Sequence, residues 1–247
     1  MKDLPACFVE YYIQRKTLVK EADSLLIRQI VATVALAASL MEGAMYKGMP
    51  QMDVEGQIFL VNRQQEMSEA YIPETEEAKV QGTTRSMRPD AANALEEMFA
   101  AAKKEAKITF LTVSGYRSYQ KQQIVYGNKV KSSGSEKRAQ EYVAPPGCSE
   151  HQLGLAMDVG ARGAPSGLNG SFGKTKAGKW LKENAHRFGF IIRYPKEWEE
   201  VTGYNYEPWH VRYVGVTHAT AMYEQQIPME TYVQSLQAEA ILDILEP

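Results

Sequence analysis

Residues 149–158 read SEHQLGLAMD and place a histidine, His151, seven residues before an aspartate, Asp158. Gly154 between them is typical of a tight turn, and the apolar residues after it are typical of a buried strand. A histidine and an aspartate at the two ends of such a turn can converge on one ion. The segment therefore predicts a turn that leads into a strand, with both side chains as candidate metal ligands.

Residues 207–210, EPWH, add His210 with a carboxylate, Glu207, three residues before it. Two imidazoles and one carboxylate form a three-ligand zinc set that leaves the fourth position to water. A glutamate outside the ligand set is what a hydrolytic site needs to take a proton from that water. Spacing alone indicates only a generic metal site, because single histidines are more often structural. His186 and His218 lie in predicted helices and are interpreted as structural.

The bulk composition is that of a soluble globular protein, with 44% hydrophobic and 23% charged residues. The 247 residues suffice for one good-sized domain and an appended segment. The formal net charge is −2 and the basic residues are scattered, so nucleic-acid binding is not expected. With only two cysteines, Cys7 and Cys148, a disulfide framework is excluded, and the absence of a C-x-x-C pair argues against a thiolate zinc site. Cys148 is interpreted as a small buried residue.

Apolar patterns along the chain predict an α+β domain with a small, mainly antiparallel sheet flanked by helices. Short apolar runs, several of them β-branched and aromatic, predict strands at 58–61, 108–113, 154–159, 190–194 and 209–214. Helical patterns occupy 89–106, 118–130, 179–188 and most of the chain after 214. Polar or glycine-punctuated loops are predicted at 68–84, 131–147 and 160–178.

The chain is predicted to consist of an N-terminal segment with a linker (1–56), a catalytic domain (57–225) and a C-terminal helix (226–247). Residues 30–41, IVATVALAASLM, match a signal-peptide core in length and are shorter than the roughly 20 residues of a membrane span. This predicts export or membrane anchoring. The alternative is an amphipathic or buried helix over 21–45, which would favour a cytoplasmic protein.

The C-terminal segment 229–245 carries a helical apolar stripe. We expect this stripe to pack on its own domain, with dimerisation or contact with a membrane surface as the alternatives. The protein is accordingly expected to be a monomer.

Three blocks in this order carry a family resemblance: SGYRS at 114–118, S-x-H-x-x-G-x-A-x-D at 149–158 and E-x-W-H-x-R-Y at 207–213. The pattern resembles the VanY-type D-alanyl-D-alanine carboxypeptidases, zinc peptidases whose relatives include the L,D-carboxypeptidases of Gram-positive cell walls. The resemblance extends from about residue 58 to residue 224. It implies a hedgehog/D,D-peptidase-like fold with the zinc site in a cleft.

The resemblance also implies the roles of the metal-site residues. His151, Asp158 and His210 would hold one Zn²⁺ per chain, and Glu207 would act as general base and then protonate the leaving amine. Arg212 is open to two interpretations, because it could orient groups around the metal site or form a structural ion pair.

For substrate binding, the resemblance implies that Arg117 holds the terminal carboxylate, for which a planar bidentate donor is well suited. Gln122 and Ser149 would add neutral hydrogen bonds to the peptide end. Gln120 and Gln123 are neighbouring alternatives to Gln122, but the family spacing favours Gln122.

The implied function is removal of the C-terminal D-alanine from peptidoglycan stem peptides outside the cytoplasm. The D,D reaction stands first on family naming, with the L,D reaction as its alternative. A cytoplasmic D-Ala-D-Ala dipeptidase is a second hypothesis, favoured if residues 30–41 form a folded helix. A zinc-stabilised cell-wall binding module is the third, and the presence of both Glu207 and Arg117 argues against it.

Overall fold

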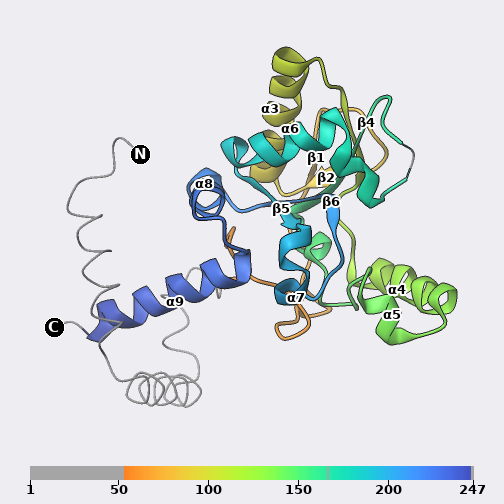
Figure 1. Ribbon diagram of the computed structural model, residues 1–247. Coiled ribbons are helices and arrows are strands. Elements are labelled where there is room, and N and C mark those ends of the chain that lie inside the picture. Colours follow the sequence, from red (N-terminus) through yellow and green to blue (C-terminus); the bar gives the residue numbers. More distant parts are fainter. Residues whose placement is uncertain (1–52, 166, 246–247) are drawn as a thin grey trace, which may run out of the picture. The chain divides into compact units, whose positions relative to one another are not determined.

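The computed structural model describes residues 53–165 and 167–245, which belong to one compact unit (Figure 1). The apolar run 30–41 and the alternative helix 21–45 lie outside the described residues. Within the described part, no helix is both long enough and apolar enough to cross a membrane. The division into segments 1–56, 57–225 and 226–247 stays a prediction.

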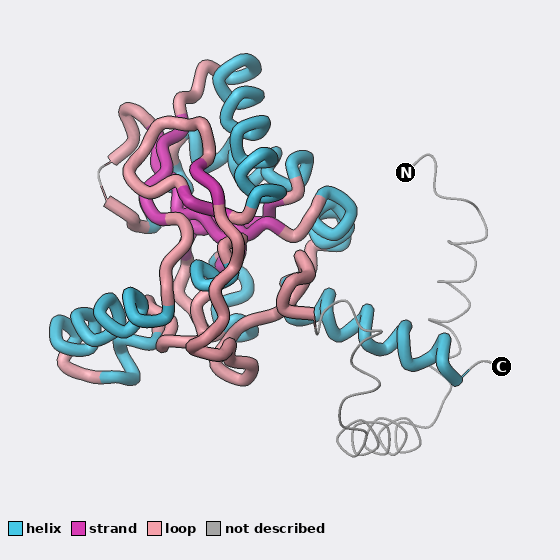
Figure 2. Tube along the Cα trace, turned by 180° about the vertical axis from the view of Figure 1, so that it is seen from behind, coloured by secondary structure: helices cyan, strands magenta, loops and turns pink. Residues whose placement is uncertain are grey.

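A four-stranded antiparallel sheet forms the centre of the described residues, as the sequence predicted. Its strand order is β3-β4-β6-β5. The strands are β3 (Phe110–Ser114), β4 (Ala156–Ala161), β6 (Glu207–Tyr213) and β5 (Phe190–Tyr194). Seen from behind, the strands lie together with helices around them (Figure 2). The α+β class is therefore confirmed.

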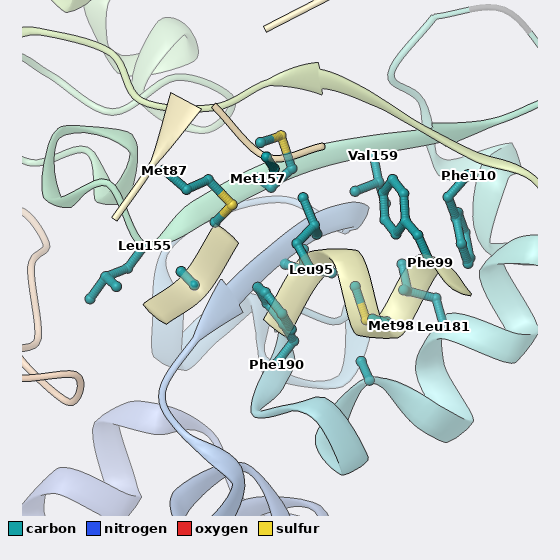
Figure 3. Close-up of a cluster of buried hydrophobic side chains, with 14 of the residues drawn as sticks. Met87, Leu95, Met98, Phe99, Phe110, Leu155, Met157, Val159, Leu181 and Phe190 are labelled. Carbon is teal, nitrogen blue, oxygen red and sulfur yellow. The ribbon is translucent and has the colours of Figure 1, made fainter. Parts of the chain in front are cut away.

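One face of this sheet packs against α3 (Pro89–Ala106) and α6 (Lys176–Asn184) (Figure 3). Proline at the first turn and Asp90 beside it suit a helix N-terminus, and α3 ends at Lys107 in the left-handed conformation. Side chains alternate along a strand, so the core takes every second residue. The core includes Leu95, Met98, Phe110, Met157, Val159, Phe190 and Val211, all buried.

The opposite face of the sheet carries the polar members of the same strands. Asp158 on β4 and His210 and Arg212 on β6 alternate with Met157 and Val211 of the core, and all three are buried. In Figure 1, α4 (Tyr119–Ser133), α5 (Glu136–Gln140) and α7 (Glu199–Thr202) lie away from α3 and α6, across the sheet. The functional site is built on this polar face.

Helices α8 (Val216–Gln225) and α9 (Met229–Leu245) form a second, smaller core with the start of the domain. Ile58, Val214, Met222, Met229 and Val233 are buried in it. The first turns of α9 therefore pack on their own domain, as expected for the apolar stripe.

The predicted strand at 58–61 is wrong. Ile58 and Val61 are buried in the two cores, but the segment pairs with no strand of the described sheet. The carbonyl of Phe59 in this stretch and that of Gln57 just before it each accept a hydrogen bond of 2.9 Å from the Arg212 guanidinium. At Phe59, an arginine side chain thus satisfies a carbonyl for which a strand partner was expected.

The three predicted loops contain short elements that the sequence patterns did not predict. The first holds β1 (Glu76–Glu77), which pairs with β2 (Ser86–Met87). The second holds α5 and the end of α4, and the third holds the 3-10 helix Gly170–Lys174 and the start of α6. Most of these elements are no more than five residues long, too short to show a period.

Candidate functional site

A cleft of about 530 Å³ opens on the polar face of the sheet. It is lined by residues from β4, β6, α4 and the loops around them. All seven residues singled out from the sequence line it: Arg117, Gln122, Ser149, His151, Asp158, Glu207 and His210.

Strand register brings the three predicted ligands together. Asp158 and His210 are directly opposed in the antiparallel pair β4–β6. His151 lies in the 3-10 helix η3 (Glu150–Leu153), which ends at Gly154 with φ of +71° before β4 begins. Glycine adopts this left-handed conformation without the steric penalty of a Cβ, so the chain can turn sharply from His151 into the strand.

The potential ligand atoms of these residues lie within 4.8 Å of one another, and all three side chains are buried. His151 Nε2 is 3.3 Å from Asp158 Oδ2, and His210 Nδ1 is 3.0 Å from Asp158 Oδ1. A tetrahedral zinc site with bonds of about 2.0–2.1 Å requires ligand atoms about 3.3 Å apart. The spacing of these atoms fits such an ion.

The outer nitrogen of each imidazole has an acceptor of its own. His151 Nδ1 donates to the Gly115 carbonyl at 2.8 Å, and His210 Nε2 lies 3.2 Å from a carboxylate oxygen of Glu150. Both acceptors require the proton on the outer nitrogen, which leaves His151 Nε2 and His210 Nδ1 free to bind a metal. The donor set thus fits zinc in both chemistry and tautomer.

The electrostatics of the site favour a positive charge between these side chains. Burial by itself raises the pKa of Asp158, but the two neighbouring histidines hold it well below its usual range. Burial also opposes protonation of His210, yet hydrogen bonds to Asp158 and Glu150 raise its pKa to about 9. A cation bound here would be stabilised by the same carboxylates.

Glu207 lies beside the ligand set without belonging to it. Its Oε2 atom is 3.9 Å from His210 Nδ1, and burial raises the pKa of its carboxyl to about 8 despite the nearby histidine. A carboxylate that is easily protonated at neutral pH suits a group that accepts and returns a proton.

Arg117 is held in place by two hydrogen bonds. Its guanidinium donates to Gln122 Oε1 at 2.7 Å and to Ser114 Oγ at 2.8 Å, while Gln122 donates to the Ala144 carbonyl at 2.6 Å. Burial lowers the pKa of Arg117, and the carboxylates of Asp158 and Glu207 counter the effect. The guanidinium therefore lies near the candidate metal site, and Gln122 and Ser114 fix its orientation.

The contact of Gln122 with a substrate stays a prediction, because both ends of its amide are engaged with the protein in this structure. Ser149 is buried at the wall of the cleft, and its hydrogen bond to substrate likewise stays a prediction. Cys148 is buried next to it and lies outside the ligand set, as interpreted from the sequence.

The other two histidines lie outside the cleft lining. His186 stacks on Tyr223 with ring centroids 3.7 Å apart, and His218 Nδ1 lies 2.8 Å from the Tyr232 hydroxyl. Neither belongs to the ligand set, in agreement with their structural interpretation.

Sequence reasoning missed Glu150, whose carboxylate is fully buried against His210. It also missed Ser114 and the carbonyl of Gly115, which orient Arg117 and His151. The one available signal for Glu150 was a charged residue next to a ligand inside an otherwise buried turn.

Three comparisons with known proteins indicate one family of carboxypeptidases. A family model, VanY: D-alanyl-D-alanine carboxypeptidase, matches residues 84–216. The putative carboxypeptidase YodJ of Bacillus subtilis is 46% identical, over 74% of this chain and 68% of its own. A D-alanyl-D-alanine carboxypeptidase of Enterococcus faecalis is 38% identical, over 73% of this chain and 67% of its own.

Two solved structures are similar over most of their length. The LD-carboxypeptidase LdcB superposes with a TM-score of 0.69 and 44% identity, covering 73% of this chain and 87% of that one. A D,D-pentapeptidase VanY from a VanB-type resistance cassette, in complex with Zn(II), superposes with a TM-score of 0.62 and 38% identity. That match covers 72% of this chain and 98% of the other.

Proposed function

Because the chain belongs to the VanY family of D-alanyl-D-alanine carboxypeptidases and is a zinc peptidase with a His–Asp–His site, we propose that it removes the C-terminal D-alanine from peptidoglycan stem peptides. The observation that carries the proposal is the convergence of a three-ligand metal set, a non-ligand glutamate and an oriented arginine in one cleft. The first two features support hydrolysis, and the arginine supports recognition of a free C-terminus.

The stem tetrapeptide is our first choice of substrate, which makes the reaction L,D. LdcB, described as an LD-carboxypeptidase with a known basis of peptidoglycan recognition, shares 44% identity with this chain, against 38% for the D,D-pentapeptidase. Family naming alone favoured the D,D reaction. The higher similarity to LdcB moves our proposal to the L,D reaction and leaves the pentapeptide as the alternative substrate.

In the proposed complex, Arg117 binds the carboxylate of the terminal D-alanine. Gln122 and Ser114 hold the guanidinium so that its donors are pre-positioned, which reduces the entropy lost on binding. Ser149 and Gln122 both line the cleft and would add neutral hydrogen bonds to the peptide end. The scissile carbonyl would then lie between Arg117 and the His–Asp–His set.

His151, Asp158 and His210 would hold one zinc ion per chain, which supplies a Lewis acid for the carbonyl and a bound water with a pKa of about 7. Glu207 takes a proton from the attacking water and delivers it to the leaving amine of D-alanine. Its burial beside His210, outside the ligand set, suits both steps.

The cleft favours a carboxypeptidase over a dipeptidase that takes free D-Ala-D-Ala. Tyr142 and Leu168 line the cleft and remain 51% and 38% exposed, so this part of it opens to solvent. A longer peptide can extend from the site through this opening. A dipeptidase has no need of such an exit.

We also propose that the enzyme works as a monomer outside the cytoplasm, where stem peptides of the mature wall are found. Fractionation of the cells that produce it, with detection of the protein and its mature N-terminus, tests the location. Recovery in the cytoplasmic fraction alone would favour the dipeptidase hypothesis.

Mass spectrometry of products from purified tetra- and pentapeptide stems, with and without a chelator, tests the function. We expect zinc-dependent release of one alanine, faster from the tetrapeptide than from the pentapeptide. Faster cleavage of the pentapeptide would make the reaction D,D, and cleavage of free D-Ala-D-Ala alone would make the enzyme a dipeptidase.

A further inference from the structure

Behind the candidate metal site, Glu150 is the centre of a buried network of charged groups. One carboxylate oxygen lies 3.2 Å from His210 Nε2. The other accepts from Arg193 Nε at 2.8 Å and from Arg212 Nη1 at 2.9 Å. Glu150 and both guanidiniums are fully buried, so water does not compete for these hydrogen bonds.

The network continues to the C-terminal helix. The Arg193 guanidinium donates two hydrogen bonds to Glu230 in the first turn of α9, at 2.6 and 3.1 Å. Arg212 donates its remaining hydrogen bonds to the carbonyls of Gln57, Phe59 and Tyr213. Four elements, η3, β5, β6 and α9, and the segment 57–59 are therefore joined behind one ligand.

We propose that Glu150 is a positioning residue that holds His210 with Nδ1 facing the metal, and that Glu230 of α9 supports it through Arg193. The inference rests on the metal site of the proposed function. Its chemical basis is that a carboxylate accepting the outer N–H of a ligand histidine fixes the tautomer and ring orientation and raises the basicity of the ligand nitrogen.

Charge balance explains why two arginines and a second glutamate are needed. A lone carboxylate in this buried position would be strongly destabilising, and one arginine would neutralise it. The second arginine brings an excess positive charge beside His210, which would oppose metal binding. Glu230 removes this excess, so that Glu150, Glu230, Arg193 and Arg212 together are neutral.

The first test uses the unmodified zinc-loaded protein. Long-range ¹H–¹⁵N NMR of the histidine rings should show His210 protonated at Nε2, with that proton protected from exchange, and Nδ1 bound to the metal. A spectrum with Nε2 bound to zinc and Nδ1 protonated would overturn the proposal, whatever the variants do.

The second test compares Glu150→Gln with wild type. The substituted amide turns its NH₂ group toward either His210 or the arginines, so one donor faces another. We expect zinc affinity, measured by competition with a chelator, to fall by about 10–100-fold. The absorption spectrum of the Co²⁺-substituted protein should also change. Wild-type zinc affinity together with a wild-type Co²⁺ spectrum would overturn the proposal, and if the variant does not fold the NMR test decides.

Glu230→Gln tests the contribution of α9 without touching His210. We expect a smaller loss of zinc affinity in the same direction, and unchanged affinity would remove α9 from the proposal. Glu105→Gln is the matched control, because it breaks a similar bidentate pair with Arg187 on the surface, at 2.9 Å for both contacts. It should leave zinc affinity unchanged.

These readouts are independent of the proposed reaction. If no stem peptide is cleaved while the tautomer and zinc affinities are as expected, the proposed substrate is wrong and the role of Glu150 stands. If stems are cleaved but Glu150→Gln binds zinc as wild type does, the proposed substrate stands and the role of Glu150 is wrong.

Discussion

At the scale of single residues, the cleft separates recognition from chemistry. Arg117 is oriented by neutral partners, Gln122 and Ser114, so its charge remains available to a substrate carboxylate. Glu207 is placed next to a ligand but outside the ligand set. Substitutions at the two positions should therefore give different kinetic signatures.

Glu207→Gln should abolish hydrolysis while zinc stays bound. The amide keeps the shape of the side chain but cannot accept the proton, and loss of a general base lowers kcat by about 10²–10⁴-fold. Metal content and kcat measured on the same preparation check this. Turnover close to wild type would exclude Glu207 as the base.

Arg117→Ala should weaken cleavage of peptides with a free C-terminal carboxylate far more than cleavage of the same peptides as amides. A charge-assisted hydrogen bond of about 1.5–3 kcal/mol predicts a loss in kcat/KM on the order of 10- to 100-fold. The ratio of kcat/KM for the acid and the amide is the quantity to measure. Equal losses for both would show that Arg117 does not bind the carboxylate.

At the scale of elements, a close backbone contact next to the first ligand positions His151. A Cβ on Gly115 would lie 2.4 Å from the Ser86 carbonyl oxygen, and the Gly115 carbonyl is the acceptor for His151 Nδ1. Only glycine allows the chain between β3 and α4 to approach β2 this closely.

Gly115→Ala should therefore lower both the free energy of unfolding and the zinc affinity, because the carbonyl must move with the backbone. Gly127→Ala in α4 is the control, since a Cβ there meets nothing within 4 Å. Alanine is favoured over glycine inside a helix by about 0.5–1 kcal/mol, so the control should become more stable and keep its zinc affinity. Denaturant unfolding and chelator competition measure the two effects, and equal zinc affinity in both variants would contradict the role of Gly115.

The elements that the sequence predicted are those whose own residues show a helical or strand pattern. Helix α3 has a long apolar period and a proline start, and β5 is a short β-branched and aromatic run interrupted only by Arg193, so both were predicted within a few residues. Residues 58–61 have the same apolar character as a strand, but a strand also requires a partner, and here Arg212 binds the carbonyl of Phe59 and that of the preceding Gln57. Short elements such as α5 have too few residues to show a pattern.

The candidate site was predictable only as far as its parts are close in sequence or belong to a family pattern. The ligands and Glu207 lie in two short motifs. The partners of Glu150 do not: Arg193 and Arg212 follow it by 43 and 62 residues. No local pattern relates a glutamate to arginines that only the strand order brings beside it.

At the scale of the whole molecule, metal binding and stability should be linked. The three ligands come from η3, β4 and β6, so an unfolded chain has no preformed site. A zinc concentration 100 times the dissociation constant would stabilise the fold by about 2.7 kcal/mol. For a chain of this size, Tm should fall by about 2–4 °C for each kcal/mol that a chelator removes.

Thermal unfolding with and without a chelator measures this linkage. His210→Ala is the control, because a protein without the ligand should show the same Tm in both conditions. A wild-type Tm that does not respond to the chelator, or full metal occupancy in His210→Ala, would contradict the metal site.

The side chains of β6 point alternately to the two faces of the sheet, and this limits where proteins of this kind can change in length. His210 and Arg212 lie on the polar face of the sheet while Val211 faces the core, so deleting one residue from this strand would turn polar-face residues toward the core and core residues toward the polar face. Catalysis and folding would be lost together, and no single compensating substitution could restore them. Insertions and deletions among natural variants should therefore be found in the connecting segments, such as 162–169, and be absent from residues 207–213.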